Sequence, residues 1–143
     1  MPDDPGRVQL LTGNANAALI SDSLPLRANL SVLENAAIVL QYQQNMDYDH
    51  AADLAWGLLG RLGQTDCAFK RDPDLSTIER FMAKLARTLI LPQPIIIIER
   101  PGLLLPDTHY PSFLDTTLAV VEDLFEQCWI VDYPWNEPLY APR

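Results

Sequence analysis

Cysteine, glycine and long apolar runs are all scarce in this chain of 143 residues. The two cysteines, Cys67 and Cys128, form no disulfide framework and are too far apart for a metal-ligand motif. No apolar run reaches the roughly 20 residues of a transmembrane helix. The acidic start, MPDDPGRVQ, lacks the apolar segment of a secretory signal peptide. We therefore expect one domain in the reducing cytoplasm that does not insert into a membrane.

Phosphate-binding glycines and positive charge are scarce too. The six glycines never follow the order GxxxxGK[ST], in which backbone N–H groups cradle the phosphates of a nucleotide. Ten Lys and Arg against nineteen Asp and Glu leave a net charge of −9, which disfavours nucleic acid as a partner. It permits contact with the basic cytoplasmic loops of membrane proteins. His50 and His109 lack ligand spacing, so we expect no metal site.

Residues 75–101, LSTIERFMAKLARTLILPQPIIIIERP, carry the clearest pattern. Ser76 and Glu79 form a capping box, which predicts a helix beginning at Ser76. Apolar residues recur at helical spacing with basic residues between them, which predicts one apolar and one solvated stripe. The apolar set is Phe81, Met82, Leu85, Ala86 and Leu89, and the basic set is Arg80, Lys84 and Arg87.

A continuous β-branched run, Ile95, Ile96, Ile97 and Ile98, follows the prolines that end this helix. Such a run is typical of a strand buried on both faces of a parallel sheet. Glu99 and Arg100 would then lie at the carboxyl end of the strand, where ligands bind in open α/β sheets. The pair is either a vestigial metal site or a salt-bridged strand end, and we favour the salt bridge.

The rest of the chain divides into short elements. We expect a strand at 8–12, then a polar loop leading to Leu24 and Pro25. Ser31 with Glu34 predicts a helix to about Gln43, and Asp47 predicts another from Tyr48 to Leu62, ended by Gly63. A helix from Pro111 or Ser112 to about Glu126, a strand at 128–132 and an extended tail at 134–143 complete the prediction.

Two polar or aromatic groups near the carboxyl terminus invite a functional interpretation. Glu122, Asp123 and Glu126 resemble paired carboxylates, but we interpret them as the solvated acidic face of one helix. The aromatic residues Trp129, Tyr133, Trp135 and Tyr140 fit a partner-binding patch and the packing of the tail on its own domain equally well.

The motifs and their spacing resemble the nucleotide-binding domains of ABC transporters. That family runs from an LSGGQ signature through a helix containing ARAL to a Walker B strand ending in Asp-Glu-Pro. The matching residues are Leu75, Ser76, Thr77, Ile78 and Glu79 for the signature, Ala86 to Leu89 for the helix, and Ile95, Ile96, Ile97, Ile98, Glu99 and Arg100 for Walker B. Upstream, residues 29–35, NLSVLEN, resemble the LTVLENV phrase that opens the family's helical subdomain.

The resemblance implies an α/β fold: a remnant of the P-loop NTPase (RecA-like) core with a short, mostly parallel sheet, plus an α-helical subdomain. The whole chain, 1–143, would be one ABC-ATPase-like domain. Residues 24–92 would hold the helical subdomain and signature helix, and residues 8–12 and 94–133 the core remnant. The resemblance also implies, as an expectation, a domain that is truncated at its N-terminus relative to the family and lacks Walker A.

The departures from the family pattern concern the catalytic groups. Thr77 and Ile78 replace the two signature glycines, and Arg100 replaces the carboxylate that polarises the attacking water. Pro106 occupies the slot of the D-loop aspartate, in the segment 103–106, and Tyr133 that of the H-loop histidine; no Q-loop glutamine stands near Thr12 and Gly13. We therefore expect no catalytic residue, no ATP or Mg²⁺ cofactor and no ATPase activity.

The function implied is that of a non-hydrolysing scaffold or regulatory partner of an ABC transporter, of lipid-trafficking type if residues 29–35 are a guide. Its partner would be an ATPase subunit, the cytoplasmic loops of a permease, or a second copy of itself. It would lie in the cytoplasm, at the periphery of the inner membrane through the transporter. Two alternatives stay open: a weak nucleotide hydrolase completed in trans by a partner subunit, and a soluble remnant with an unrelated interaction role.

Overall fold

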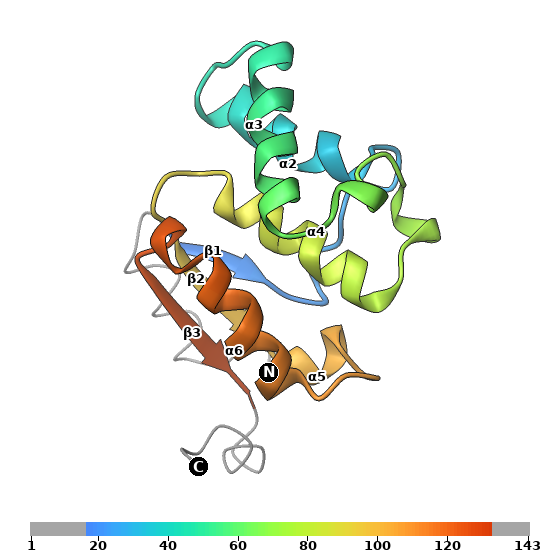
Figure 1. Ribbon diagram of the computed structural model, residues 1–143, viewed down its shortest axis with the longest axis vertical. Coiled ribbons are helices and arrows are strands. Elements are labelled where there is room, and N and C mark those ends of the chain that lie inside the picture. The colour runs from blue at the N-terminus through green and yellow to red at the C-terminus, as the bar shows by residue number, and fades with distance from the viewer. Residues whose placement is uncertain (1–16, 133–143) are drawn as a thin grey trace.

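A parallel sheet forms one layer of the protein in the computed structural model, which describes residues 17–132 (Figure 1). Its strands are β1 (Ala17–Ile20), β2 (Ile95–Glu99) and β3 (Gln127–Val131), in the spatial order β1-β2-β3. Ile20 lies opposite Ile98, which in turn lies opposite Ile130. Parallel neighbours need long crossover connections, and here helices supply both of them. The expected α/β class with a short parallel sheet is confirmed.

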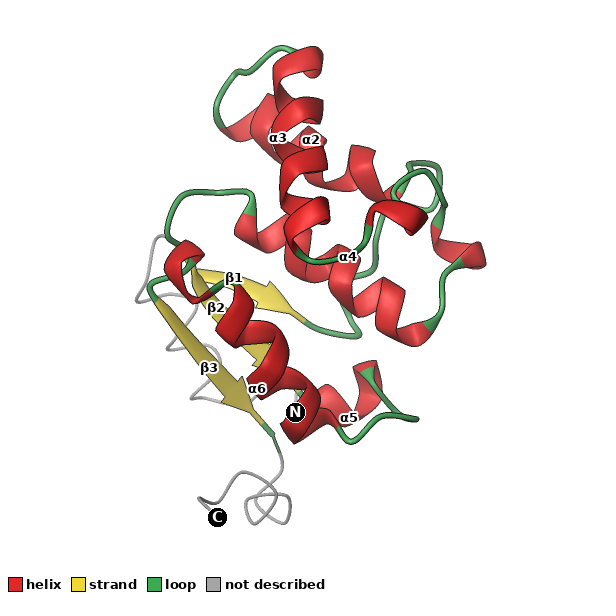
Figure 2. Ribbon diagram, in the orientation of Figure 1, coloured by secondary structure: helices red, strands yellow, loops and turns green. Residues whose placement is uncertain are grey.

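The first crossover is a layer of three helices between β1 and β2. These are α2 (Val32–Gln43), α3 (Tyr48–Arg61) and α4 (Thr77–Leu89), with short 3-10 turns η1 (Thr65–Cys67) and η2 (Asp72–Asp74) before α4. Figure 2 shows α2 and α3 at the end of the molecule farthest from the sheet, and α4 between them and β1. The helical layer therefore reaches the sheet through α4.

The start of each helix in this layer follows the sequence prediction. Ser31 and Ser76 cap α2 and α4, each within a complete capping box, and Asp47 caps α3. These side chains satisfy backbone N–H groups that have no partner inside the helix. Gly63, just beyond α3, has a φ of 71°, the left-handed conformation that glycine adopts without a steric penalty.

The second crossover joins β2 to β3 through α5 (Pro101–Leu104), α6 (Tyr110–Val120) and the 3-10 turn η3 (Glu122–Leu124). The predicted helix to Glu126 is too long, because the backbone leaves the helical conformation at Val121 (φ −122°, ψ 19°). Val121 is fully buried, and the Glu126 N–H donates to the Pro94 carbonyl. These contacts turn the chain toward β3, so tertiary packing ends the helix.

Two further expectations about the elements need correction. The segment 17–20, predicted as part of a loop, is the edge strand β1. The predicted strand at 8–12 and the tail at 134–143 lie outside the described residues. The solvated stripe predicted for α4 is wrong, since Lys84 is 3% exposed and only Arg80 and Arg87 keep partial contact with solvent along that side.

The core lies between the helical layer and the sheet and continues under α6. Ile96, Ile97 and Ile98 are fully buried, which confirms the expected strand covered on both faces. Phe81 of α4 meets Phe113 of α6 edge to face, with ring centroids 5.9 Å apart. Two crossovers far apart in the sequence thus share one aromatic contact.

Asn35 fixes the loop that leads into the first helix of the helical layer. Its side-chain amide is buried, donates to the carbonyls of Arg27, Leu30 and Ser31 at 3.2, 3.3 and 2.9 Å, and accepts from the Arg27 N–H at 2.9 Å. One side chain therefore satisfies several polar groups of the loop before α2.

We expect Asn35→Ala to lower the free energy of unfolding by about 2 kcal/mol or more, because the buried loop groups lose their partner. Gln43→Ala is the control, since Gln43 is exposed in the same helix and should change stability by less than about 0.5 kcal/mol. Urea denaturation followed by circular dichroism measures both. Equal small effects would show that water replaces the amide.

Candidate functional site

The carboxylate of Glu99 is the centre of a polar network at the carboxyl ends of β1 and β2. Glu99 is 1% exposed, and the Ser21 hydroxyl, at the end of β1, donates to its Oε1 at 2.7 Å. Ser21 is also buried, at 1% exposure, and its oxygen accepts from the Ser23 N–H. A carboxylate and a hydroxyl from neighbouring strands thus meet at the edge where ligands bind in open α/β sheets.

Arg100 places a positive charge next to this carboxylate. Its Nη2 lies 3.5 Å from Glu99 Oε1, the weak end of hydrogen-bond distance, so the favoured prediction of a salt-bridged strand end is confirmed. Its backbone adopts the left-handed region, with φ 45°, and its N–H donates to the Val131 carbonyl at 2.7 Å. The chain turns sharply here from β2 into α5 while keeping contact with β3.

Lys84 brings a buried ammonium from α4 to the same strand end. Its Nζ donates to the Ser21 carbonyl at 3.1 Å. Burial lowers the pKa of this ammonium, and the nearby guanidinium of Arg87 lowers it further. Ser21 therefore contacts Glu99 through its hydroxyl and Lys84 through its carbonyl, which joins β1, β2 and α4 at one residue.

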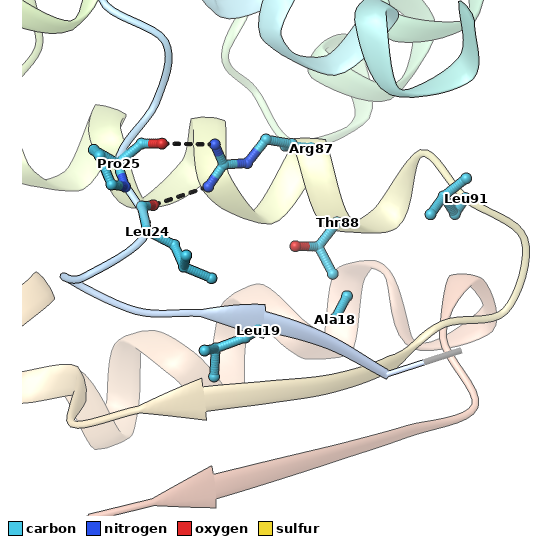
Figure 3. A pocket seen from close by; sticks show the side chains of 7 residues that line it. All are labelled: Ala18, Leu19, Leu24, Pro25, Arg87, Thr88 and Leu91. Atoms are coloured by element: carbon cyan, nitrogen blue, oxygen red, sulfur yellow. Dashed lines mark hydrogen bonds between the residues drawn. The ribbon is translucent and has the colours of Figure 1, made fainter. Parts of the chain in front are cut away.

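Arg87 ties α4 to the segment that follows Ser21 (Figure 3). Its guanidinium donates to the carbonyls of Leu24 and Pro25 at 3.0 and 2.9 Å. Burial lowers the pKa of Arg87, and the charge of Arg27 adds to that effect. A hollow of about 280 Å³ beside β1 is lined by Leu24, Pro25, Arg87 and Thr88, among other residues.

A second groove, of about 260 Å³, runs along α2. It is lined by Arg27, Asn35, Ile38, Val39, Tyr42, Gln43 and Arg87. Two arginines and no acidic residue line it, although the chain as a whole carries a net charge of −9. Tyr42, one of the residues that line the groove, is 75% exposed. The groove is therefore a locally basic and partly apolar surface.

The signature-like residues span the start of α4: Leu75 and the N-cap Ser76 precede the helix, and Thr77 to Glu79 begin it. Ser76 Oγ accepts from the Glu79 N–H at 3.1 Å, and Glu79 Oε1 accepts from the Ser76 N–H at 2.9 Å. The hydrogen bond from the Ser76 N–H lowers the pKa of Glu79. Leu75 is buried, whereas Ile78 is 37% exposed. The polar side chains of this segment thus serve helix capping, and an apolar side chain faces solvent.

The structure brings some of the predicted site residues together and adds two that the prediction missed. Glu99 and Arg100 lie side by side, and α4 connects them to the signature-like turn. Residues 103–106 lie at the end of α5 and beyond it, while Thr12, Gly13 and Tyr133 lie outside the described residues. Ser21 and Lys84 were missed; the spacing of Arg80, Lys84 and Arg87 along one helix was the available signal.

Within residues 17–132, no group of three or more His, Cys, Asp and Glu side chains gathers in a way that would hold a metal ion. Among the helices of the same residues, none is long and apolar enough to cross a membrane.

Comparisons with known proteins agree with this geometry at the level of the fold. No protein-family model and no curated protein matches the chain. Among solved structures, the dimeric structure of MJ0796, a bacterial ABC transporter cassette, matches with a TM-score of 0.63 and 18% identity over 82% of this chain and 52% of that one. The chain thus has the fold of part of an ABC cassette and spans about half the length of that relative.

We expect Ser21→Ala to lower the free energy of unfolding by about 2 kcal/mol, because the buried Glu99 carboxylate loses a donor at 2.7 Å. The matched control is Ser112→Ala, whose hydroxyl belongs to an exposed residue of α6 and should matter by less than about 0.5 kcal/mol. Thermal and urea denaturation measure the difference. A Ser21→Ala variant as stable as the control would contradict the network.

Lys84 makes stability depend on alkaline pH. Because its pKa is lower in the folded than in the unfolded chain, the unfolded chain binds more protons between the two values, and stability rises with pH there. Below the pKa of Lys84 in the folded chain, the buried ammonium is charged and destabilises the fold fully. This destabilisation disappears as the pH rises through the pKa of Lys84 in the unfolded chain.

We therefore expect wild type to gain stability relative to Lys84→Met between pH 7 and about pH 10. Urea denaturation of both proteins at each pH measures the gain. Arg80→Met is the control, because its partly exposed guanidinium keeps its charge over this range. Parallel curves for wild type and Lys84→Met would contradict the burial of a charged ammonium.

Proposed function

We propose that this protein is a non-hydrolysing relative of ABC ATPases that acts as a scaffold or regulatory partner of an ABC transporter. The observation that carries the proposal is that the carboxylate of Glu99, in an ABC-cassette fold, is buried and engaged by other side chains of the chain. Its carboxylate is buried, receives the Ser21 hydroxyl and lies beside the Arg100 guanidinium. The position after the strand, where a base would polarise water, holds an arginine, which cannot accept a proton.

The first turn of α4 supports the same proposal. Nucleotide phosphates are commonly held by backbone N–H groups that glycine leaves accessible. Here Thr77 and Ile78 carry β-branched side chains, and the Ser76 hydroxyl and Glu79 carboxylate are engaged with each other. A γ-phosphate approaching this turn would meet side-chain atoms and a carboxylate. We infer that neither the Walker half nor the signature half of an ABC-type ATP site is complete on this chain, so ATP and Mg²⁺ are not its cofactors.

The choice of partner rests on the similar structure of MJ0796 and on the basic groove along α2. MJ0796 is described as dimeric, so pairing with a second cassette, either a copy of this chain or a complete ATPase, is the first association to test. The basic groove along α2 offers a second contact, suited to a permease segment that presents a carboxylate between apolar side chains. The lipid-trafficking type of transporter and a position at the inner membrane belong to the same proposal.

We expect calorimetric titration of the purified chain with Mg²⁺ and ATP to give no saturable heat, while a complete ABC ATPase titrated alongside binds.

We also expect the tagged chain to co-purify with an ATPase subunit or permease expressed in the same cells. Light scattering measures the mass of that complex. Arg27→Glu should weaken a permease complex, because it reverses charge in the groove along α2.

Saturable nucleotide binding at micromolar affinity would overturn the proposal. So would failure to bind an ATPase or permease in any pull-down. Phosphate release that arises only when the chain is mixed with a partner subunit, and that is lost on Glu99→Ala, would favour a nucleotide hydrolase completed in trans.

A further inference from the structure

An aromatic pair lies on the outside of the helical layer. Trp56 of α3 stacks on Phe69, with ring centroids 5.8 Å apart and an angle of 26° between the planes. The two residues are 44% and 72% exposed, respectively. The helix that carries Trp56, α3, lies with α2 at the end of the molecule farthest from the sheet (Figure 1). Large aromatic side chains in solvent contact dominate binding interfaces.

The chain holds this pair in place. Phe69 lies between Ala68 and Lys70, whose carbonyls accept from the N–H groups of Leu33 and Val32, both at 2.9 Å. These bonds fasten the segment to the first turn of α2, while Trp56 stands on the middle of a fourteen-residue helix. An exposed aromatic group that is already ordered loses little conformational freedom when a partner binds it.

Carboxylates lie on the same face of α3 as Trp56. Asp53 is three residues before Trp56 and Asp49 is seven before it, so helical geometry places them in one row. Both are exposed and are four residues apart, a like-charge spacing that destabilises a helix. The first Lys or Arg along α3 is Arg61, which forms an ion pair with Asp123. The face therefore has unbalanced negative charge next to two aromatic rings.

Two basic residues follow Phe69 in the sequence. Lys70 Nζ lies 3.6 Å from Glu79 Oε2. Arg71 is exposed, and its neighbour Asp72 forms an ion pair with Arg80. Among the described residues, neither base forms an ion pair with Asp49 or Asp53.

We propose that Asp49, Asp53, Trp56 and Phe69, the aromatic–acidic face, bind an arginine- or lysine-bearing amphipathic segment of a partner protein. A guanidinium is attracted to the face of an aromatic ring and forms charge-assisted hydrogen bonds with carboxylates, and its apolar neighbours cover the exposed rings. Anionic lipid and nucleic acid would be repelled by the same carboxylates. The inference rests on the partner role proposed above and specifies the chemistry of one partner segment.

The test uses the full chain and two synthetic peptides of equal length. One is an amphipathic helix with leucine on one face and arginine on the other; its match carries glutamate in place of arginine. We expect saturable binding of the arginine peptide only, with amide NMR shifts centred on α3 and on Phe69. Trp56→Ala should weaken binding about tenfold or more. Asp49→Asn with Asp53→Asn should weaken it about threefold and reduce its sensitivity to salt.

Matched controls separate a specific surface from general acidity. Asp107→Asn with Asp115→Asn makes the same change in net charge at exposed positions near α6, and Tyr42→Ala removes an aromatic side chain that is 75% exposed on α2. Both should bind the arginine peptide as wild type does. Phe69→Ala provides a second test in a loop, should Trp56→Ala disturb α3 in circular dichroism.

Four outcomes would overturn the inference: no saturable binding, equal binding of the glutamate peptide, shifts centred elsewhere, or equal weakening by the controls. Co-purification with transporter subunits does not depend on these peptides. If such complexes form while the arginine peptide fails to bind, the aromatic–acidic face is disproved and the partner role stands. If the peptide binds and no subunit co-purifies, the partner role fails by itself.

Discussion

The fold depends on hydrogen bonds from basic side chains of α4 to main-chain carbonyls. Lys84 donates to Ser21, and Arg87 donates to Leu24 and Pro25, so α4 holds the connection between β1 and the helical layer. Burying an ammonium has a cost that only a hydrogen-bonded position offsets. Because α4 also packs on β1 and leads into β2, these bonds set how the helical layer sits on the sheet.

The candidate site is a consequence of this arrangement. Ser21 is fixed by Lys84 on one side and donates to Glu99 on the other. The strand edge that binds ligands in other α/β folds is here filled by contacts within the chain. These contacts join β1, β2 and α4 at one buried junction. The outer surface of the helical layer carries exposed aromatic and charged side chains.

Local chemistry made much of the fold predictable. Capping needs a side chain and a backbone N–H a few residues away, so Ser31, Ser76 and Asp47 marked their helices correctly. The run Ile95 to Ile98 identified a buried strand, since β-branched residues favour extended backbone in a packed sheet. β1 escaped prediction because AALI is short and equally compatible with a helix or loop. The end of α6 was not predicted, because the burial of Val121 at the end of the helix depends on tertiary packing.

Neighbouring residues and composition were enough to predict the starts of the helices, the central strand, the acidic charge and the resemblance to an ABC cassette. The burial of Lys84, the contact of Ser21 with Glu99 and the stacking of Phe69 on Trp56 arise only in the folded chain. Residues 13 to 78 positions apart form these contacts. Whether such a basic, polar or aromatic side chain faces water, the core or a partner depends on what the fold packs against it.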